Sequence, residues 1–193
     1  MGLRTWIRST TLRARPAADY PDISPWFAGK DFTSDWITKK LDAWFEVLGP
    51  IKGQPLSALE VGSYEGRSAV ALLEYMPRCH LTCVDAFFDP ETEKRFDHNL
   101  APYGDRLIKL KGRAAAALDT LQSNNRRFDV IYLDCGKTRA GVFALSALAW
   151  PLLKPQGVLI WDDLRWGRDR PPAERPGPAT ELFRDTFCSC MSV

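Results

Sequence analysis

The sequence lacks the features that mark a membrane protein or a polyanion-binding protein. No apolar run among its 193 residues approaches the ~18 residues that a membrane-spanning helix needs, so we expect no transmembrane segment. The 26 lysines and arginines nearly balance the 24 aspartates and glutamates, so net charge gives no indication of a nucleic-acid partner. The length suits one domain with a substantial core.

Cysteine and histidine are present only in uninformative arrangements. The five cysteines form an odd count without zinc-ligand spacing, which indicates structural or incidental thiols and suits a reducing, cytoplasmic compartment. Cys188 and Cys190 stand close together but lack partner ligands. The two histidines, His80 and His98, are unsuitably placed for catalysis.

Acidic residues are missing from the first eighteen residues, which contain four arginines (Arg4, Arg8, Arg13 and Arg15). We interpret residues 1–30 as a loosely held basic arm and a proline-rich linker, with a membrane-surface helix or a targeting segment as alternatives. Residues 31–165 carry the patterns of the main domain. Residues 166–193 form a proline- and arginine-rich segment with one short helix near Thr180–Phe187.

The chain is organised around the stretch Leu59-Glu60-Val61-Gly62-Ser63-Tyr64-Glu65-Gly66-Arg67-Ser68. Apolar residues before it predict a short buried strand, and the apolar spacing over residues 69–76 predicts an amphipathic helix. Gly62 allows a sharp bend and the close approach of a ligand, and Gly66 allows the helix to pack closely on the strand. The free N–H groups of the first helical turn then face the ligand.

This glycine spacing differs from the dinucleotide-binding pattern Gly-x-Gly-x-x-Gly, because residue 64 is not glycine; a dehydrogenase is therefore disfavoured. The next predicted strand, His80–Asp85, ends in an acid 25 residues after Glu60. Nucleotide-binding α/β domains place a carboxylate at this point to accept both ribose hydroxyls. Asp85 is therefore a candidate ribose ligand.

Strand and helix patterns alternate through the rest of the main domain, which predicts a doubly wound, mainly parallel α/β sheet of five strands. The apolar run of residues 128–133 indicates burial on both faces, as in a parallel sheet. The other predicted elements are strands at Arg106–Leu110 and Val158–Asp163 and helices at Pro90–Leu100 and Arg139–Leu153.

A further helix is predicted before the sheet. Its candidate N-caps are Thr33, Ser34 and Asp35, and apolar residues over 37–48 fall on one face. Trp36 is expected to pack in the core rather than to bind a ligand.

Three carboxylates should converge at one edge of this sheet. Asp134 ends the fourth predicted strand, and Asp162 and Asp163 end the fifth, so all three lie at the edge where parallel α/β sheets bind ligands. Uncompensated, they would repel and raise one another's pKa. A divalent cation such as Mg²⁺ resolves that repulsion. The alternative is that Asp162 or Asp163 only caps a loop and no metal binds.

The glycine-bearing stretch resembles motif I of the class I S-adenosylmethionine-dependent methyltransferases. The resemblance implies a Rossmann-like methyltransferase sheet and places Glu60 beneath the methionine amino group of the cofactor. It makes the loop after the third strand, with Gly112 and Arg113, a candidate adenine contact. The cofactor-binding residues expected from pattern and resemblance together are Glu60, Gly62, Ser63, Gly66, Arg67, Ser68, Asp85, Gly112, Arg113 and Asp134.

Asp-x-x-Lys after the fourth strand and Asp-Asp after the fifth resemble the metal-dependent small-molecule O-methyltransferases, of the catechol, caffeoyl-coenzyme A and macrolide-sugar types. The resemblance implies metal ligands at Asp134, Asp162 and Asp163. A metal that binds two adjacent acceptor oxygens lowers the pKa of a hydroxyl. Lys137, with a pKa lowered by partial burial, would remove the proton. A solvated loop cation is the alternative for Lys137.

The chain looks closest to a bacterial branch of this superfamily. The shared stretches are Phe32–Trp36, Glu65–Ser68, Trp150–Pro155 and Asp162–Asp163, and the resemblance covers about residues 31 to 165. One departure is that Asp134-Cys135-Gly136-Lys137 stands where the branch has Asp-Gly-Ser-His. Lys137 must therefore replace the histidine if that histidine is the base.

Only thirty residues follow Asp163, too few for the antiparallel C-terminal hairpin of such sheets. We therefore expect the fifth predicted strand to be a bare edge and a homodimer through that edge to be one way of covering it. The expected function is O-methylation of a small hydroxylated molecule, with S-adenosylmethionine and a divalent metal. No nucleic acid is expected, since no Asn-Pro-Pro-Tyr-like loop follows the fourth strand. The alternative is a truncated, inactive S-adenosylmethionine-binding or interaction module.

Overall fold

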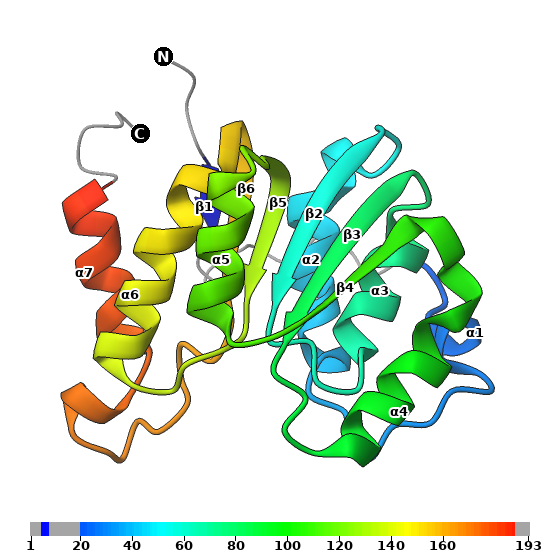
Figure 1. Ribbon diagram of the computed structural model, residues 1–193, viewed down its shortest axis with the longest axis horizontal. Coiled ribbons are helices and arrows are strands. Elements are labelled where there is room, and N and C mark those ends of the chain that lie inside the picture. The colour runs from blue at the N-terminus through cyan, green and yellow to red at the C-terminus, as the bar shows by residue number, and fades with distance from the viewer. Residues whose placement is uncertain (1–4, 8–19, 188–193) are drawn as a thin grey trace.

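The computed structural model describes residues 5–7 and 20–187. These residues form one six-stranded sheet with the order β1-β6-β5-β2-β3-β4, in which every strand pair is parallel (Figure 1). The strands are β1 Thr5–Ile7, β2 Leu56–Val61, β3 Cys79–Asp85, β4 Leu107–Lys111, β5 Phe128–Leu133 and β6 Leu153–Trp161. The predicted doubly wound parallel sheet is confirmed. Arg4, Arg8, Arg13, Arg15 and the Cys188–Cys190 pair lie outside the described residues.

Helices cover both faces of the sheet (Figure 1). They are α1 Ser24–Phe27, α2 Leu41–Leu48, α3 Arg67–Tyr75, α4 Pro90–Leu100, α5 Ala114–Ser123, α6 Arg139–Ala149 and α7 Gly177–Phe187. Short 3-10 turns precede or follow them at Thr38–Lys40, Gly49–Ile51, Ala101–Arg106, Trp150–Leu152 and Pro172–Glu174. Among the described residues, no helix combines the length and the apolar character that a bilayer crossing requires.

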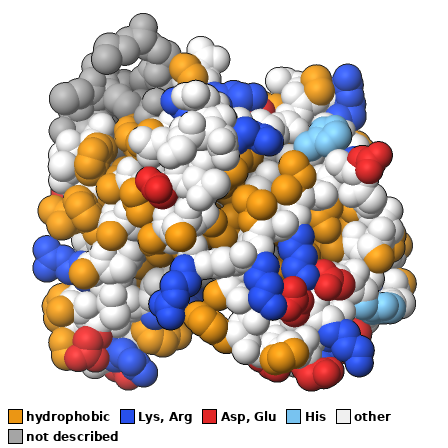
Figure 2. Space-filling model, in the orientation of Figure 1, with side chains coloured by type: hydrophobic (Ala, Val, Ile, Leu, Met, Phe, Trp, Pro, Cys, Tyr) orange, Lys and Arg blue, Asp and Glu red, His pale blue; other side chains and the backbone are white. Residues whose placement is uncertain are grey.

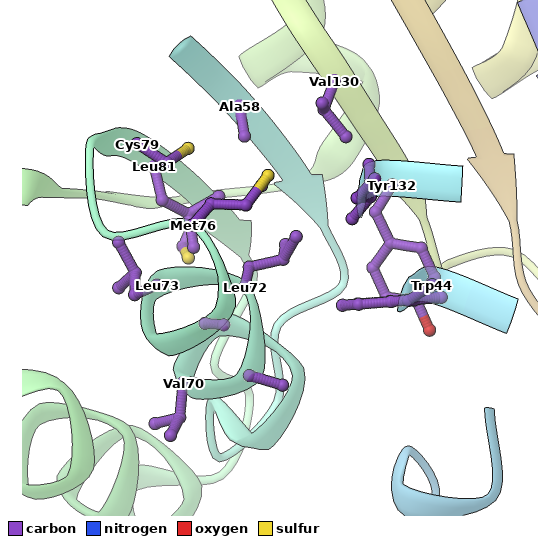
Figure 3. Close-up of a cluster of buried hydrophobic side chains, with 14 of the residues drawn as sticks. Trp44, Ala58, Val70, Leu72, Leu73, Met76, Cys79, Leu81, Val130 and Tyr132 are labelled. Carbon is purple, nitrogen blue, oxygen red and sulfur yellow. The ribbon is translucent and has the colours of Figure 1, made fainter. Parts of the chain in front are cut away.

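Alternate side chains of each central strand enter two different cores, as the period of two in a strand requires. On β5, Val130 and Tyr132 face the core beneath α2, α3 and α4, whereas Ile131 and Leu133 face the core beneath α5, α6 and α7. Figure 3 shows part of the first core, with Trp44 of α2 beside Tyr132. Because both faces are covered, the strands read as continuous apolar runs.

The strand order reverses between β2 and β5, which lie side by side at the centre of the sheet. In open α/β sheets this switch point opens a crevice beyond the carboxyl ends of the strands, and ligands bind there. In Figure 1 these ends point downward, away from the marked chain termini. The fold therefore brings the loops after β2, β3, β4, β5 and β6 to one edge.

The expectation that β6 is a bare edge is wrong over three residues. Thr5–Ile7 pairs in parallel with Val158–Ile160, so the edge that a homodimer was expected to cover is partly occupied by the chain itself. A three-residue segment carries too weak a periodic signal to be recognised as a strand from sequence. The absence of an antiparallel strand next to β6 is confirmed for the described residues.

Candidate active site and cofactor cleft

A cleft of about 680 Å³ opens at the carboxyl ends of the strands. The loops after β2, β3, β4, β5 and β6 all contribute to its wall, and its size is that of a small-molecule site. Of the predicted site residues, those lining this cleft are Gly62, Asp85, Gly112, Arg113, Asp134, Lys137 and Asp163. Ser63, Arg67 and Ser68 line a small adjoining hollow that shares Gly62 and Asp134 with the cleft.

The two glycines of the β2–α3 loop have steric reasons to be glycine. Gly62 has φ +95°, and a Cβ there would lie 2.2 Å from the backbone oxygen of Asp134. Gly66 has φ +83°, and a Cβ there would lie 2.2 Å from Cδ2 of Leu100 on α4. Gly62 therefore brings β2 and β5 together at the cleft, whereas Gly66 packs the loop on α4 and lies away from the cleft wall.

Glu60 lies beneath the loop rather than on the cleft surface. Its side chain is fully buried, and burial raises the pKa of its carboxyl group to about 7. Oε2 accepts a hydrogen bond from the Cys83 thiol at 3.4 Å, while Oε1 has no partner among the described residues. The buried Ser63 hydroxyl lies close enough to the Glu60 carboxyl to oppose this rise in pKa, but it makes no well-aligned hydrogen bond among the described residues. Orphaned buried polar atoms beneath a glycine loop fit a polar ligand seated on that loop.

Asp85 joins the glycine loop to the end of β3. Its two carboxylate oxygens accept the backbone N–H groups of Tyr64 at 2.9 Å and Phe87 at 2.8 Å. Each oxygen keeps a further lone pair, so the carboxylate can also accept two ligand hydroxyls from within the cleft. This geometry suits the predicted contact with a ribose.

The loop after β4 offers less to an adenine than the pattern indicated. The N–H of Gly112 already donates to the carbonyl of Asp85 at 2.8 Å, so it is not free for a base. The guanidinium of Arg113 lies 5.7 Å from the ring centre of Phe88, which is 81% exposed at the cleft. Phe88, which the sequence reasoning did not single out, is the larger apolar surface here.

The segment before α2 is fastened to the glycine loop by side chains. Thr33 donates from its N–H and its hydroxyl to the two carboxylate oxygens of Glu65, both at 2.7 Å. Arg67 donates to Asp35 at 3.1 Å, and its guanidinium lies 4.0 Å from the ring centre of Phe27. Phe32–Trp36 and Glu65–Ser68, two stretches behind the family resemblance, therefore hold each other. Arg67 anchors this segment as well as lining the adjoining hollow.

Trp36 was expected to pack in the core. It lines the cleft instead, with 61% of its surface exposed. Its ring centre lies 5.2 Å from that of Tyr64, at an interplanar angle of 34°. The core-packing prediction is wrong because Asp35 accepts the N–H groups of Ile37 and Thr38 and starts a 3-10 turn there. Trp36 therefore faces the cleft, whereas Phe32 and Ile37 on either side of it pack against the core.

Asp134, Asp162 and Asp163 do converge. One carboxylate oxygen from each lies within 4.8 Å of the others. Lys137 donates to Asp134 at 3.0 Å and also to Asp163, and Lys40 donates to Asp162. Hard carboxylate oxygens in such a cluster fit a divalent cation such as Mg²⁺. The two lysines are an alternative source of positive charge.

The pKa values at this cluster follow from the same contacts. Burial and the neighbouring Asp162 raise the pKa of Asp134 to about 7, although Lys137 opposes the shift. Burial alone would lower the pKa of Lys137, but Asp134 and Asp163 outweigh burial and raise it. The prediction of a lowered pKa for Lys137 is therefore wrong, because two carboxylates flank the ammonium.

Two members of this cluster were missed from sequence. Lys40 lies in the 3-10 turn before α2, some 120 residues from its partner, and no local pattern marks it. Tyr132 donates its hydroxyl to Asp162 and lies two residues before Asp134 on β5. Because alternate residues of a strand point to the same face of the sheet, Tyr132 lies on the same face as Asp134. This spacing could have identified the tyrosine from the sequence.

A family model described as a methyltransferase domain matches residues 59–164. This range runs from the end of β2, just before the glycine loop, to just past Asp162 and Asp163. The chain belongs to the methyltransferase-domain family. No curated protein sequence matches it.

Solved methyltransferase structures share the fold. A putative caffeoyl-CoA O-methyltransferase from Staphylococcus aureus has 18% identity and a TM-score of 0.61, over 80% of this chain and 76% of that one. An O-methyltransferase from Bacillus cereus in complex with S-adenosylhomocysteine has 19% identity and a TM-score of 0.61, over 76% and 67% of the two chains. MycE, from the mycinamycin biosynthetic pathway, was solved with Mg and S-adenosylhomocysteine. It has 16% identity and a TM-score of 0.58, over 90% of this chain and 41% of MycE. These structures confirm the predicted methyltransferase fold.

Proposed function

We propose that this methyltransferase domain binds S-adenosylmethionine and transfers its methyl group to an oxygen of a small hydroxylated acceptor, with help from a divalent cation. One observation carries the proposal: the glycine loop, Asp85, and Asp134 and Asp163 of the three-aspartate cluster all line the same cleft. Structurally similar proteins crystallised with S-adenosylhomocysteine, or with that molecule and Mg, support the choice of cofactor and metal.

Residues at different positions in the cleft would contact different parts of the cofactor. Gly62 lets a ligand approach the backbone, and Asp85 accepts the ribose hydroxyls. Glu60 and Ser63 provide the buried polar floor beneath the loop. Trp36, Tyr64 and Phe88 surround the opening with aromatic surface. Bound S-adenosylmethionine would supply an electrophilic methyl group, and these residues would hold the cofactor in the cleft that Asp134 and Asp163 also line.

The residues proposed to act on the acceptor do so through their charges. Asp134, Asp162 and Asp163 would hold the cation, which lowers the pKa of a bound hydroxyl. Lys137 is the proposed catalytic residue. Its flanking carboxylates keep it as an ammonium. A positive charge there would stabilise the acceptor oxygen once the hydroxyl proton has passed to solvent water. By positioning both reactants in one cleft, these residues would lower the entropic part of the barrier.

Calorimetric titration tests this proposal. Wild-type protein should bind S-adenosylhomocysteine, and Mg²⁺ should bind as a second, separate event. Asp134→Asn should lower Mg²⁺ affinity by about tenfold or more while S-adenosylhomocysteine affinity changes only a few-fold. Asp119→Asn, on the exposed face of α5, is the matched control and should change neither affinity.

Two results would contradict parts of the proposal. An equal Mg²⁺ response in wild type and Asp134→Asn would remove Asp134 from the metal site. Binding of S-adenosylhomocysteine without methyl transfer to any of a broad panel of hydroxylated compounds would favour the alternative, an inactive cofactor-binding module.

A further inference from the structure

Lys40 reaches the aspartate cluster from the 3-10 turn before α2. Its ammonium donates to Oδ2 of Asp162, and the Tyr132 hydroxyl donates to the same oxygen. The other oxygen, Oδ1, accepts the N–H of Asp163 at 2.6 Å. Both lone pairs of Oδ2 are therefore in use, and a divalent cation on either oxygen would share one carboxylate with the ammonium. Like charges that close repel each other, so the two cannot both occupy Asp162 favourably.

The ion pair of Lys40 and Asp162 is less exposed than those over α4. Lys109 and Lys111 pair with Glu93 there, where Figure 2 shows basic and acidic side chains beside one another at the surface. The side chain of Asp162 is only 7% exposed, so water compensates little of its charge. Removing the ammonium without a replacement would leave a nearly buried, uncompensated carboxylate, which is costly. Another cation must therefore take its place for Lys40 to leave.

The second lysine of the cluster does not relieve this dependence. Lys137 pairs with Asp134 and Asp163. Among residues 20–187, Lys40 is the one basic side chain within ion-pair distance of Asp162. A divalent cation brings two positive charges, so it can replace one ammonium and leave the three carboxylates better compensated than before. Lys40 therefore occupies Asp162 in the cation-free protein and can be replaced there.

The turn that carries Lys40 continues the segment that lines the cofactor cleft. Trp36 lies four residues earlier, and both side chains line the cleft. The upstream part of this segment is fastened to the glycine loop, where Arg67 donates to Asp35 at 3.1 Å. Its downstream end is fastened to the end of β6 through Lys40 and Asp162. Loss of that pair would therefore remove one of the two ties that hold the segment across the cleft.

We propose that Lys40 competes with the divalent cation for Asp162, and that this competition couples the cation to the cofactor. In the cation-free protein the ammonium holds Asp162 and keeps the segment with Trp36 against the cleft. When the ammonium gives way to a cation, the segment is held less firmly, and the cofactor binds less tightly. The proposal rests on the cation site proposed above and adds its regulation by this chain. Because coupling is reciprocal, cofactor and cation weaken one another's binding by the same factor.

Calorimetric titration with Mg²⁺ tests the competition. Lys40→Met keeps the aliphatic stem and removes the ammonium, so the variant should bind Mg²⁺ about tenfold more tightly than wild type, because its site is always vacant. Lys39→Met is the matched control, since Lys39 is the adjacent, exposed lysine and makes no ion pair with any residue in 20–187. Its Mg²⁺ affinity should stay within about twofold of wild type. Lys40→Arg keeps the positive donor and should retain the weaker, wild-type affinity.

Amine acetylation measures the displacement in the wild-type protein, independently of any variant. Brief treatment with an acetylating reagent, followed by tandem mass spectrometry, distinguishes modification of Lys40 from that of Lys39. Saturating Mg²⁺ should raise the modification of Lys40 several-fold over sodium chloride of equal ionic strength, because the amine leaves its carboxylate while general screening is the same. The modification of Lys39 should not change.

Titration of S-adenosylhomocysteine with and without Mg²⁺ measures the coupling. In wild type, Mg²⁺ should lower the affinity about fivefold, a coupling at the weak end of the usual range because buried Ile37 still anchors the segment. In Lys40→Met the affinity should change by less than about twofold on adding Mg²⁺, since no tie remains to be broken. Without Mg²⁺, this variant should already bind S-adenosylhomocysteine as weakly as Mg²⁺-saturated wild type does.

The outcomes separate this proposal from the proposed function. Failure of both wild type and Lys40→Met to bind Mg²⁺ would overturn the proposed cation site, and the competition with it. Mg²⁺ binding that Lys40→Met leaves unchanged, or that Lys39→Met strengthens equally, would overturn the competition alone. Modification of Lys40 that Mg²⁺ does not alter would do the same. A wild-type affinity for S-adenosylhomocysteine that is independent of Mg²⁺ would overturn the coupling.

Discussion

The two halves of the cleft are built in different ways. The half formed by β2 and β3 depends on backbone geometry, since Gly62 has no room for a side chain and Asp85 accepts two backbone N–H groups. The half formed by β5 and β6 depends on side-chain charges, in which Lys40 and Lys137 balance Asp134, Asp162 and Asp163. Packed backbone tolerates little change, whereas charged side chains can re-pair around a cation or an acceptor. We therefore expect substitutions in the first half to act on folding and cofactor binding together.

Gly62→Ala should have the largest effect. The added Cβ would meet the Asp134 backbone oxygen at 2.2 Å in a backbone conformation that favours glycine, so β2 and β5 must separate. We expect destabilisation by about 3 kcal/mol or more and loss of S-adenosylhomocysteine binding. Urea unfolding and titration measure the two effects. Gly53→Ala, where nothing lies within 4 Å of the new Cβ, is the control. Equal stability of the two variants would refute the steric argument.

Glu60 should make the protein less stable as the pH rises. Burial raises the pKa of the folded carboxyl from 4.5 to about 7, so between these values the folded state holds a proton that the unfolded state has lost. The contribution of Glu60 to the free energy of unfolding is fully present below pH 4.5. It decreases by about 3 kcal/mol as the pH rises from 4.5 to 7.

Urea unfolding at pH 5 and pH 8 measures this difference. Asp134, with a pKa raised to about 7, contributes in the same direction. Glu60→Gln should therefore reduce the pH dependence without abolishing it and should stabilise the protein at pH 8. A pH dependence that the substitution leaves unchanged would show that Glu60 ionises normally.

Arg67→Met should have an intermediate effect, because Arg67 both pairs with Asp35 and lies over Phe27 and Phe32. We expect a loss of about 1–2 kcal/mol in stability and weaker S-adenosylhomocysteine binding, since the segment carrying Trp36 is released. The matched control is Arg78→Met, whose guanidinium donates only to the exposed Gly53 carbonyl among the described residues. Unchanged cofactor affinity in Arg67→Met would show that the segment is not needed for binding.

Trp36→Ala should have the smallest effect on stability. The ring is 61% exposed and lies tilted against Tyr64, so the free energy of unfolding should change by about 0.5 kcal/mol or less. Cofactor affinity should still fall several-fold, because the ring lines the cleft. Titration and unfolding of the same variant separate the two quantities. A stability loss as large as that of Arg67→Met would place Trp36 in the framework rather than in the binding surface.

Local patterns predicted most of the fold. The helix predicted at Pro90–Leu100 has those bounds, and the strands ending at Asp85 and near Asp134 lie where the apolar runs placed them. Strand β1 escaped notice because three residues cannot show a period. The helix predicted after Thr33–Asp35 begins only at Leu41, because Asp35 caps a preceding 3-10 turn.

The candidate site was only partly predictable. That Asp134, Asp162 and Asp163 would meet followed from sequence, since the carboxyl ends of parallel strands share one edge. The exposure of Trp36 and the pairing of Lys40 with Asp162 did not follow, because both depend on how the segment before α2 crosses the sheet.

By itself, then, the sequence determined the element order, the glycine turn and the acids at the strand ends, because these depend on residues close together in the chain. Only the tertiary structure decided which cations face those acids and which way the pKa of Lys137 shifts. These properties depend on contacts between distant residues, such as Lys137 with Asp163 and Lys40 with Asp162, which arise from the packing of α2 and β6 rather than from a local pattern.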